Sequence, residues 1–364
     1  MESQTLIDPA EVPAESSSKT VNWKQVGTYI ALTFGLTWVL DLALFLSGGL
    51  TSPGVGIALQ FQMLLPAFSA MLLGMFFFKD SPIYLKNNQT HSRWFIGYFL
   101  FFTLLYAAAV IASFIQPDLT MTLSSVMLLP GLIGMILVLV LRAVGGKDTF
   151  ASVGMAAGKA KYWLLFALGI LLFTGSQTLL NGLFSLGEKV DLAPLLAQGA
   201  AAGMPATVFM IVLTIQTVLL GPFLGLLITF GEEYGWRGYL QPALMGLGRV
   251  RGVGLLGIIW GIWHWPVIWM GYNYPGRPIL GSLLMVIFCI GLSYVLGYAV
   301  LKGKGIWIAA FLHALVNQST SFFMGILYAP KDLAFSFGIG IPGLLMLALV
   351  VLWILRDPIW KENE

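Results

Sequence analysis

The sequence predicts an all-α integral membrane protein, a polytopic helical bundle with about ten transmembrane helices. First, 58% of the 364 residues are hydrophobic and only 10% are charged, whereas a soluble domain carries about 25% charged residues. Second, apolar runs recur along the chain, and a span needs about 20 such residues. Third, connections rich in lysine and arginine alternate along the chain with connections that contain few, as in membrane proteins. A water-soluble fold is therefore excluded.

The elements follow one another with short polar connections. Residues 1–22 are rich in Ser, Pro and Glu and lack the basic and apolar regions of a cleavable signal peptide. We expect a disordered polar tail there, followed by an uncleaved first membrane helix. Eight or nine spans are the alternative to ten. The expected spans are 25–48, 55–78, 94–115, 125–142, 162–186, 205–230, 252–272, 278–301, 305–327 and 336–355.

Basic residues set the expected orientation. With a cytoplasmic N-terminus, only Lys189, Arg277 and Lys331 of the 19 Lys and Arg residues fall on the outer side. Because cytoplasmic loops are enriched in these residues, we predict an even number of spans with both termini in the cytosol. We further divide the chain into N-terminal membrane helices at 23–204, a catalytic core at 205–330, and a last helix with a short tail at 331–364.

The stretch TFGEEYGWRG at 229–238 places charge at the end of an apolar run. Ionisable residues inside a membrane are costly and indicate a functional site. Glu233 and Arg237 are four residues apart, the spacing of a helical ion pair, which would leave Glu232 free of it. We expect both glutamates at the cytoplasmic end of the span 205–230.

Two histidines also lie within predicted spans, His264 in WGIWHWP and His313 in FLHALVN. Asn317 follows His313 by four residues and is expected on the same helix face. Trp260 precedes His264 by one turn, and the proline after His264 predicts a kink. Topology and spacing therefore predict that these side chains meet Glu232 in one cavity.

Such a set suits hydrolysis of an amide bond. Glu232 could act as the general base that takes a proton from water, with His264 as its partner. His313 and Asn317 could donate hydrogen bonds to a developing oxyanion. No cofactor is expected, although Glu232, His264 and His313 could bind zinc if the enzyme depended on a metal. The single cysteine, Cys289, excludes a disulfide framework and a cysteine-based structural metal site.

The three motifs in order resemble the CAAX protease and bacteriocin-processing (CPBP) family of intramembrane glutamic endopeptidases. They are Glu-Glu-x3-Arg from Glu232, aromatic-x3-His from Trp260, and His-x3-Asn from His313, and the resemblance covers about residues 205–327. It implies the same roles for Glu232, His264, His313 and Asn317, with Glu233 and Arg237 as supporting groups. One difference is visible, because the second motif usually begins with Phe rather than Trp.

The substrate is left open by the sequence. Type II members of this family remove the last three residues of prenylated Cys-a-a-X proteins, whereas many bacterial members are linked to peptide maturation or bacteriocin self-immunity. The expected partners are a hydrophobic or prenylated peptide and membrane lipid, without nucleic acid. The expected location is a bacterial plasma membrane, with the site toward the cytoplasm. The rival interpretation is a non-enzymatic transporter or scaffold, in which Asp41 of the first span could take part.

Overall fold

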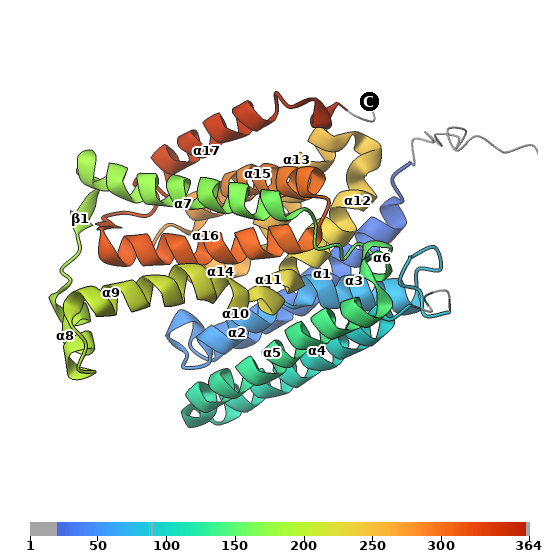
Figure 1. The fold of residues 1–364 in the computed structure, drawn as a ribbon, viewed down its shortest axis with the longest axis horizontal. Helices are drawn as coiled ribbons and strands as arrows, with labels where there is room; N and C mark the ends of the chain where they lie inside the picture. The colour runs from blue at the N-terminus through green and yellow to red at the C-terminus, as the bar shows by residue number, and fades with distance from the viewer. Residues whose placement is uncertain (1–19, 87, 89, 362–364) are drawn as a thin grey trace, which may run out of the picture.

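The computed structural model describes residues 20–86, 88 and 90–361 and shows a bundle of helices lying side by side (Figure 1). This confirms the all-α prediction. A single two-stranded antiparallel sheet pairs β1 (Gly187–Lys189) with β2 (Tyr328–Pro330) at one end of the bundle. Of the predicted disordered tail 1–22, residues 1–19 lie outside the described part.

The N-terminal half forms two groups of helices. The helices α1, α2 and α3 are followed by the antiparallel pair α4 and α5, and α7 then crosses to the far side of the bundle (Figure 1). The elements are α1 Trp23–Leu46, α2 Val55–Gln62, α3 Leu65–Phe76, α4 Ser92–Ile115, α5 Thr120–Gly145, α6 Lys147–Ala151, α7 Ala160–Leu183 and α8 Ala193–Ala201, with 3-10 turns at Gly49–Thr51 and Pro117–Leu119.

The C-terminal half contains one long, irregular helical path and five further helices. The path contains α9 Ala206–Thr214, the π-helical segment Ile215–Leu220, α10 Gly221–Leu224, α11 Leu226–Glu233, the π-helical segment Tyr234–Leu240, α12 Gln241–Leu244 and the 3-10 turn Met245–Leu247. After it come α13 Arg249–Trp263, α14 Trp265–Trp269, α15 Pro278–Gly303, α16 Ile306–Ile326 and α17 Ile341–Ile354, with a 3-10 turn at Pro358–Trp360.

Seven helices in the described part are long and apolar enough to cross a membrane. The other three predicted spans are also helical, but they depart from the simple pattern. The span 252–272 is divided at His264 into α13 and α14, and α17 has only 14 residues. The helix α16 has 21 residues but carries polar groups such as His313 and Asn317 in its middle. The seven are Trp23–Leu46, Val55–Phe76, Ser92–Ile115, Pro117–Gly145, Ala160–Leu183, Ala206–Leu224 and Pro278–Gly303.

The connections gather at two opposite ends of the bundle. The helices α6 and α12 and the C-terminus lie at one end, and β1 and α8 lie at the other (Figure 1). The three basic residues predicted on the minority side share the β1 end: Lys189 is in β1, Lys331 follows β2, and Arg277 pairs with Asp332 at 2.7 Å. The segregation of basic residues is therefore present in the fold, whereas the end that faces the cytosol stays a prediction.

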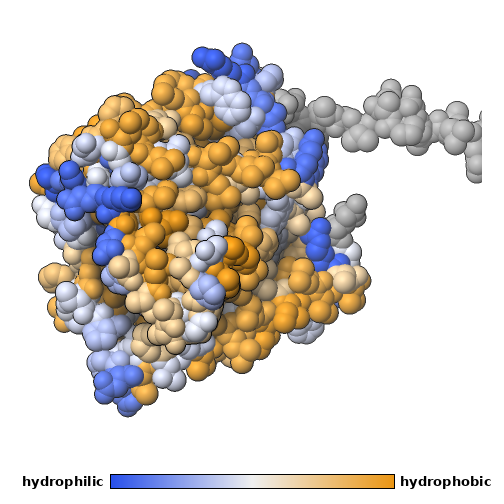
Figure 2. Space-filling model, turned by 60° about the vertical axis from the view of Figure 1, so that its left-hand side comes forward, coloured by the Kyte–Doolittle hydropathy of each residue, from blue (hydrophilic) through white to orange (hydrophobic). Residues whose placement is uncertain are grey.

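The outer surface has the composition of a membrane protein. Figure 2 shows that apolar residues cover most of one face, with hydrophilic residues confined to smaller patches. Many large apolar side chains are exposed on the membrane-length helices, for example Leu46 at 76% and Met121 at 78%. An apolar surface this extensive is far beyond the patches found on soluble monomers. The chain is an integral membrane protein.

Close backbone contacts fix the helices that carry the site. A Cβ atom on Gly231, beside the glutamate pair, would lie 2.5 Å from the carbonyl oxygen of Met63. A Cβ atom on Gly261 of α13 would lie 2.5 Å from the Cα atom of Val286 in α15. Only glycine allows such an approach. These contacts hold the path around α11 against α2 and α3, and hold α13 against α15.

Candidate active site

Glu232, His264, His313 and Asn317 line one cavity of about 270 Å³. They come from α11, the α13–α14 junction and α16, and α15 supplies a further wall. The structure therefore brings together the four residues that the sequence placed in one site. Their catalytic roles stay a prediction, because the geometry shows proximity rather than reaction.

The glutamate pair lies deeper in its helical path than the sequence suggested. Glu232 and Glu233 were expected where a span ends, but the path continues beyond them to Leu247. Glu232 is only 3% exposed and Glu233 is 0% exposed. Directly after Glu233 the path changes to the π-helical segment Tyr234–Leu240, and a further irregularity lies at Gly225, between α10 and α11.

The predicted ion pair is present and buried. Arg237 Nη1 donates to Glu233 Oε1 at 3.0 Å, and both side chains are 0% exposed. Arg237 Nη2 also donates to Ser293 Oγ at 3.2 Å. His313 Nδ1 donates to the same Glu233 oxygen at 2.8 Å. One carboxylate therefore joins the arginine of its own helix to a histidine of α16.

Glu232 has a different environment from its neighbour. Trp260 Nε1 donates a hydrogen bond to Glu232 Oε2 at 2.9 Å. The same indole ring lies under the Arg237 guanidinium, whose Cζ atom is 4.2 Å from the ring centroid. In the described part of the chain Glu232 forms no ion pair. It therefore faces the cavity as a carboxylate held by a neutral donor, which suits a general base.

His264 is held at the break between α13 and α14. Its Nδ1 lies 2.9 Å from the Trp260 carbonyl oxygen. Since a carbonyl can only accept, Nδ1 carries the hydrogen, and Nε2 of the neutral ring is left with the lone pair. Trp263 contacts the ring edge-on at a centroid distance of 4.8 Å. These contacts fix the ring plane and leave Nε2 free to accept a proton. The break also confirms the kink that Pro266 predicted.

The tautomer of His313 follows from the same reasoning. A carboxylate accepts, so Nδ1 of His313 donates to Glu233 and Nε2 lies on the far side of the ring. For Nε2 to donate to an oxyanion the ring must carry both protons, and Glu233 supplies the countercharge. Asn317, one turn further along α16, adds an amide to the same cavity wall. The two residues thus place two polar groups on one wall of the cavity.

No motif in the sequence indicated that α2 would contribute to this cavity. Gln60, Gln62 and Met63 all line it, and Tyr106 of α4 donates to Gln60 Oε1 at 2.5 Å. Their only sequence signal is a pair of glutamines in an apolar run, which alone indicates little. Cys289, whose position in an apolar run fits either a buried or a lipid-facing residue, is buried and also lines the cavity, with Sγ 3.9 Å from His264 Nδ1.

Asp41 lies elsewhere. It is 2% exposed and does not line this cavity, and neither carboxyl oxygen has a hydrogen-bond partner among the described residues. The structure thus shows a buried, unpartnered carboxyl at this position of the first span. Helix α1 has a different link to the site, since Thr37 Oγ1 accepts from Trp263 Nε1 at 2.9 Å.

A preformed metal site is not found in the part of the chain that the structure describes. There, no group of three or more His, Cys, Asp or Glu side chains is placed to hold a metal ion. Nδ1 of His264 and Nδ1 of His313 are both engaged in hydrogen bonds. Zinc held by Glu232, His264 and His313 would therefore need a different arrangement of these side chains, and a chelator test addresses it directly.

Replacing Trp260 by phenylalanine tests the hydrogen bond to Glu232. The ring over Arg237 is kept, whereas the N–H donor is lost. Hydrogen bonds to charged groups are worth about 1.5–3 kcal/mol, so we expect kcat to fall by about tenfold or somewhat more without loss of the fold. The measurement is kcat for peptide cleavage beside the thermal unfolding midpoint. An unchanged kcat would show that this hydrogen bond does not matter for the reaction.

The comparison with known proteins finds a family that this region resembles. Residues 214–319 match the family model described as type II CAAX prenyl endopeptidase Rce1-like. This segment is similar to that family. It contains the glutamate pair, Arg237, Trp260 and both histidines of the cavity, and it confirms the resemblance that the three motifs indicated. Helix α2 and its glutamines lie outside the matched residues.

One curated relative is similar to part of the chain. The chain is 31% identical over 101 residues to CAAX prenyl protease 2 of Methanococcus maripaludis, a match that covers 26% of this chain and 37% of that protein. The chain thus spans little more than a third of the length of the curated relative it matches. No solved structure gives a significant match.

Proposed function

We propose that this protein is an intramembrane endopeptidase that hydrolyses a peptide bond with a water molecule activated by Glu232. The observation that carries the proposal is the convergence of Glu232, His264, His313 and Asn317 on one cavity within the segment that matches the endopeptidase family. A transporter would not need a carboxylate, a proton-accepting ring nitrogen and two further donors around one small volume.

The proposed reaction begins with water between Glu232 and His264. Glu232 takes one proton while the water oxygen bonds to the carbonyl carbon of the scissile peptide. His264 donates from Nδ1 to the Trp260 carbonyl oxygen, so its Nε2 carries a lone pair. This Nε2 accepts a hydrogen bond from the same water. The carbon–nitrogen bond then breaks, and the proton held by Glu232 passes to the departing amine. Atoms and charge balance without a further reagent.

The negative charge that develops on the carbonyl oxygen is proposed to be stabilised from α16. His313 Nε2 and the Asn317 amide are the donors, and preformed donors of this kind typically contribute a factor of about 10²–10³ each to kcat. Glu233 acts through His313, because its Oε1 accepts from Nδ1 at 2.8 Å. Arg237 acts one step further away, by holding Glu233 in place. Both are therefore positioning residues.

For the substrate we propose the C-terminal Cys-a-a-X sequence of a prenylated protein, from which the last three residues would be removed. The support is the family match and the name of the curated relative. We further propose that the site opens toward the cytosol, which the clustering of basic residues at one end of the bundle supports. A hydrophobic peptide without a prenyl group, as in peptide maturation, is the alternative that the assay distinguishes.

The test uses the full chain purified into lipid nanodiscs. A farnesylated Cys-a-a-X peptide and the same peptide without farnesyl are incubated with it, and the products are identified by mass spectrometry. Release of the C-terminal tripeptide from the farnesylated peptide alone is the expected result. Cleavage of both peptides at equal rates would favour a general hydrophobic-peptide protease. Absence of any cleavage would contradict the enzymatic proposal.

A chelator distinguishes the metal-free reaction from the zinc alternative. Since Glu232 and His264 suffice to activate water in the proposed reaction, activity should be unchanged within experimental error after incubation with a strong chelator. Loss of activity that is restored by added zinc would overturn the metal-free mechanism. In that case Glu232, His264 and His313 would be the ligands to test.

A further inference from the structure

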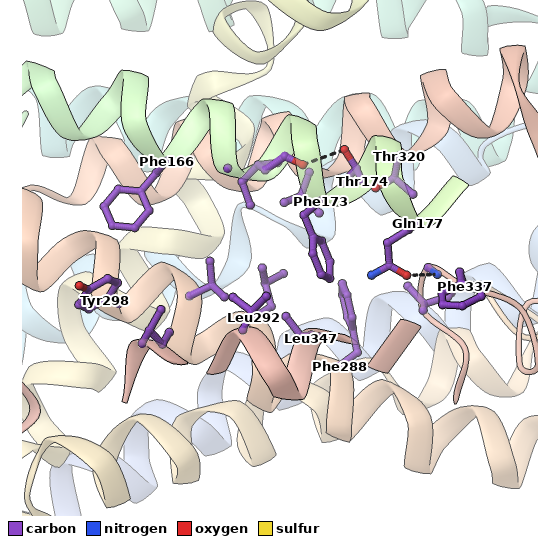
Figure 3. Close-up of a pocket in the computed structure, with 18 of the residues that line it drawn as sticks. Phe166, Phe173, Thr174, Gln177, Phe288, Leu292, Tyr298, Thr320, Phe337 and Leu347 are labelled. Atoms are coloured by element: carbon purple, nitrogen blue, oxygen red, sulfur yellow. Dashed lines mark hydrogen bonds between the residues drawn. The ribbon is translucent and has the colours of Figure 1, made fainter. Parts of the chain in front are cut away.

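A second cavity, of about 410 Å³, lies between α7, α15, α16 and α17. Figure 3 shows Phe166 and Phe173 of α7 on one side, with Phe288, Leu292 and Leu347 opposite them. The lining is almost entirely apolar. Protein interiors rarely leave voids larger than a water molecule, so a cavity of this size calls for an occupant.

Three polar side chains at one end of this cavity already have partners. Gln177 Oε1 accepts from the backbone N–H of Gly338 at 2.7 Å, and Asn181 Oδ1 accepts from that of Phe337 at 2.8 Å. Thr174 Oγ1 donates to Ser319 Oγ at 3.1 Å. Ordered water needs two to four polar partners, whereas apolar cavities stay dry and accept apolar molecules. The occupant is therefore expected to be a hydrocarbon.

The opposite end has the features of a lipid headgroup region. Lys302 lies there with a 28% exposed side chain, and its Nζ pairs with Asp357 Oδ2 at 2.6 Å. Tyr298 donates to the same carboxylate oxygen at 2.7 Å. Trp353, 67% exposed, also lines the cavity. Cationic groups at cavities between membrane helices bind lipid headgroups, and tryptophan and tyrosine are enriched at the membrane interface.

We propose that this cavity binds one acyl chain of a membrane glycerophospholipid, with the headgroup beside Lys302. A single chain fits an apolar volume of about 410 Å³ that has hydrogen-bonded amides at one end and Lys302 and Tyr298 at the other. The bilayer supplies such chains next to the opening. A filled cavity would also restore the packing contacts that a void forfeits.

The bound chain would lie against a wall shared with the candidate active site. Phe288 and Leu292 of α15 line both this cavity and the one that contains Glu232. The lipid would therefore support one side of the catalytic cavity without entering it. This inference needs no assumption about the reaction, because lipid binding is measured independently of cleavage.

The test uses a phosphatidylethanolamine with a photoactivatable diazirine on its acyl chain, in vesicles of phosphatidylcholine and phosphatidylglycerol. Cross-linked peptides from the full-length protein are identified by mass spectrometry. Gly169→Phe and Ile170→Phe add volume at two adjacent lining positions of α7. Gly97→Phe on α4 is the matched control, because a Cβ atom at Gly97, as at Gly169, has nothing within 4 Å.

We expect cross-links on α7, α15 and α17 in the native protein and in Gly97→Phe. In Gly169→Phe or Ile170→Phe the yield of these cross-links should fall by about tenfold, which corresponds to about 1.4 kcal/mol of binding free energy. Equal labelling of all four proteins would overturn the proposal. Complete loss of cross-linking on adding excess farnesylated Cys-a-a-X peptide would also overturn the proposal, because the cavity would then bind the substrate rather than a lipid.

Discussion

Replacing Glu232 by glutamine is expected to lower kcat for peptide cleavage by about 10²–10⁴-fold, the usual contribution of a general base. Glutamine has nearly the same shape, and its side-chain oxygen can still accept the hydrogen bond that Trp260 donates to Glu232. The amide cannot take a proton from water. The loss should therefore appear in kcat, while KM and the thermal unfolding midpoint change little.

Glu188→Gln is the matched control for this substitution. Glu188 lies in β1, is exposed, and is outside the cavity that contains Glu232. Its replacement should leave kcat unchanged. Full cleavage by the Glu232→Gln protein would rule out the proposed base. If neither the native protein nor either variant cleaves any peptide, but the native protein moves a solute across vesicles, the transporter interpretation is favoured.

The part of the site that could be predicted from sequence rests on local periodicity. The ion pair between Glu233 and Arg237 follows from a four-residue spacing on one helix. The kink beside His264 follows from Pro266, which lacks a backbone N–H. The placement of His313 and Asn317 on one cavity wall follows from the same helical period. Each of these depends only on residues close together in the chain.

Contacts between distant segments could not be predicted in this way. The hydrogen bond from Trp260 to Glu232 and the bond from His313 to Glu233 join residues 28 and 80 positions apart. The sequence motifs predicted that His313 donates to an oxyanion and that Glu233 pairs with Arg237. They did not indicate a contact between His313 and Glu233. The contribution of Gln62 from α2 to the cavity depends on how α2 packs against the path around α11. Single-sequence patterns carry no information about such packing.

The number of membrane spans was harder to predict from the sequence than the helical ranges themselves. Apolar length predicts a helix well, and all ten predicted ranges are helical in the structure. Only seven of these helices satisfy length and hydropathy together. Two of the others, α13–α14 and α16, contain His264, His313 and Asn317. The residues that build the candidate site are thus among those that make these helices shorter or more polar.

Arg237→Met is expected to lower the free energy of unfolding by about 3–5 kcal/mol, because it leaves the buried Glu233 carboxylate without its guanidinium partner. Both side chains of this pair are 0% exposed. Arg277→Met is the matched control, since the Arg277–Asp332 pair at 2.7 Å has side chains that are 42% and 35% exposed. Exposed pairs contribute about 0–1 kcal/mol. Thermal and denaturant unfolding in the same detergent measure both variants.

The double variant Glu233→Leu with Arg237→Met separates the structural role of this pair from its role in the reaction. With Glu233 absent the His313 ring can stay neutral, so removing both charges together leaves no uncompensated ion, and most of the lost stability should return. Cleavage should stay impaired, because His313 Nδ1 then lacks the oxygen to which it donates at 2.8 Å. If the double variant regains both stability and full kcat, Glu233 does not position His313. If Arg237→Met loses no more stability than Arg277→Met, the buried pair is not a structural element.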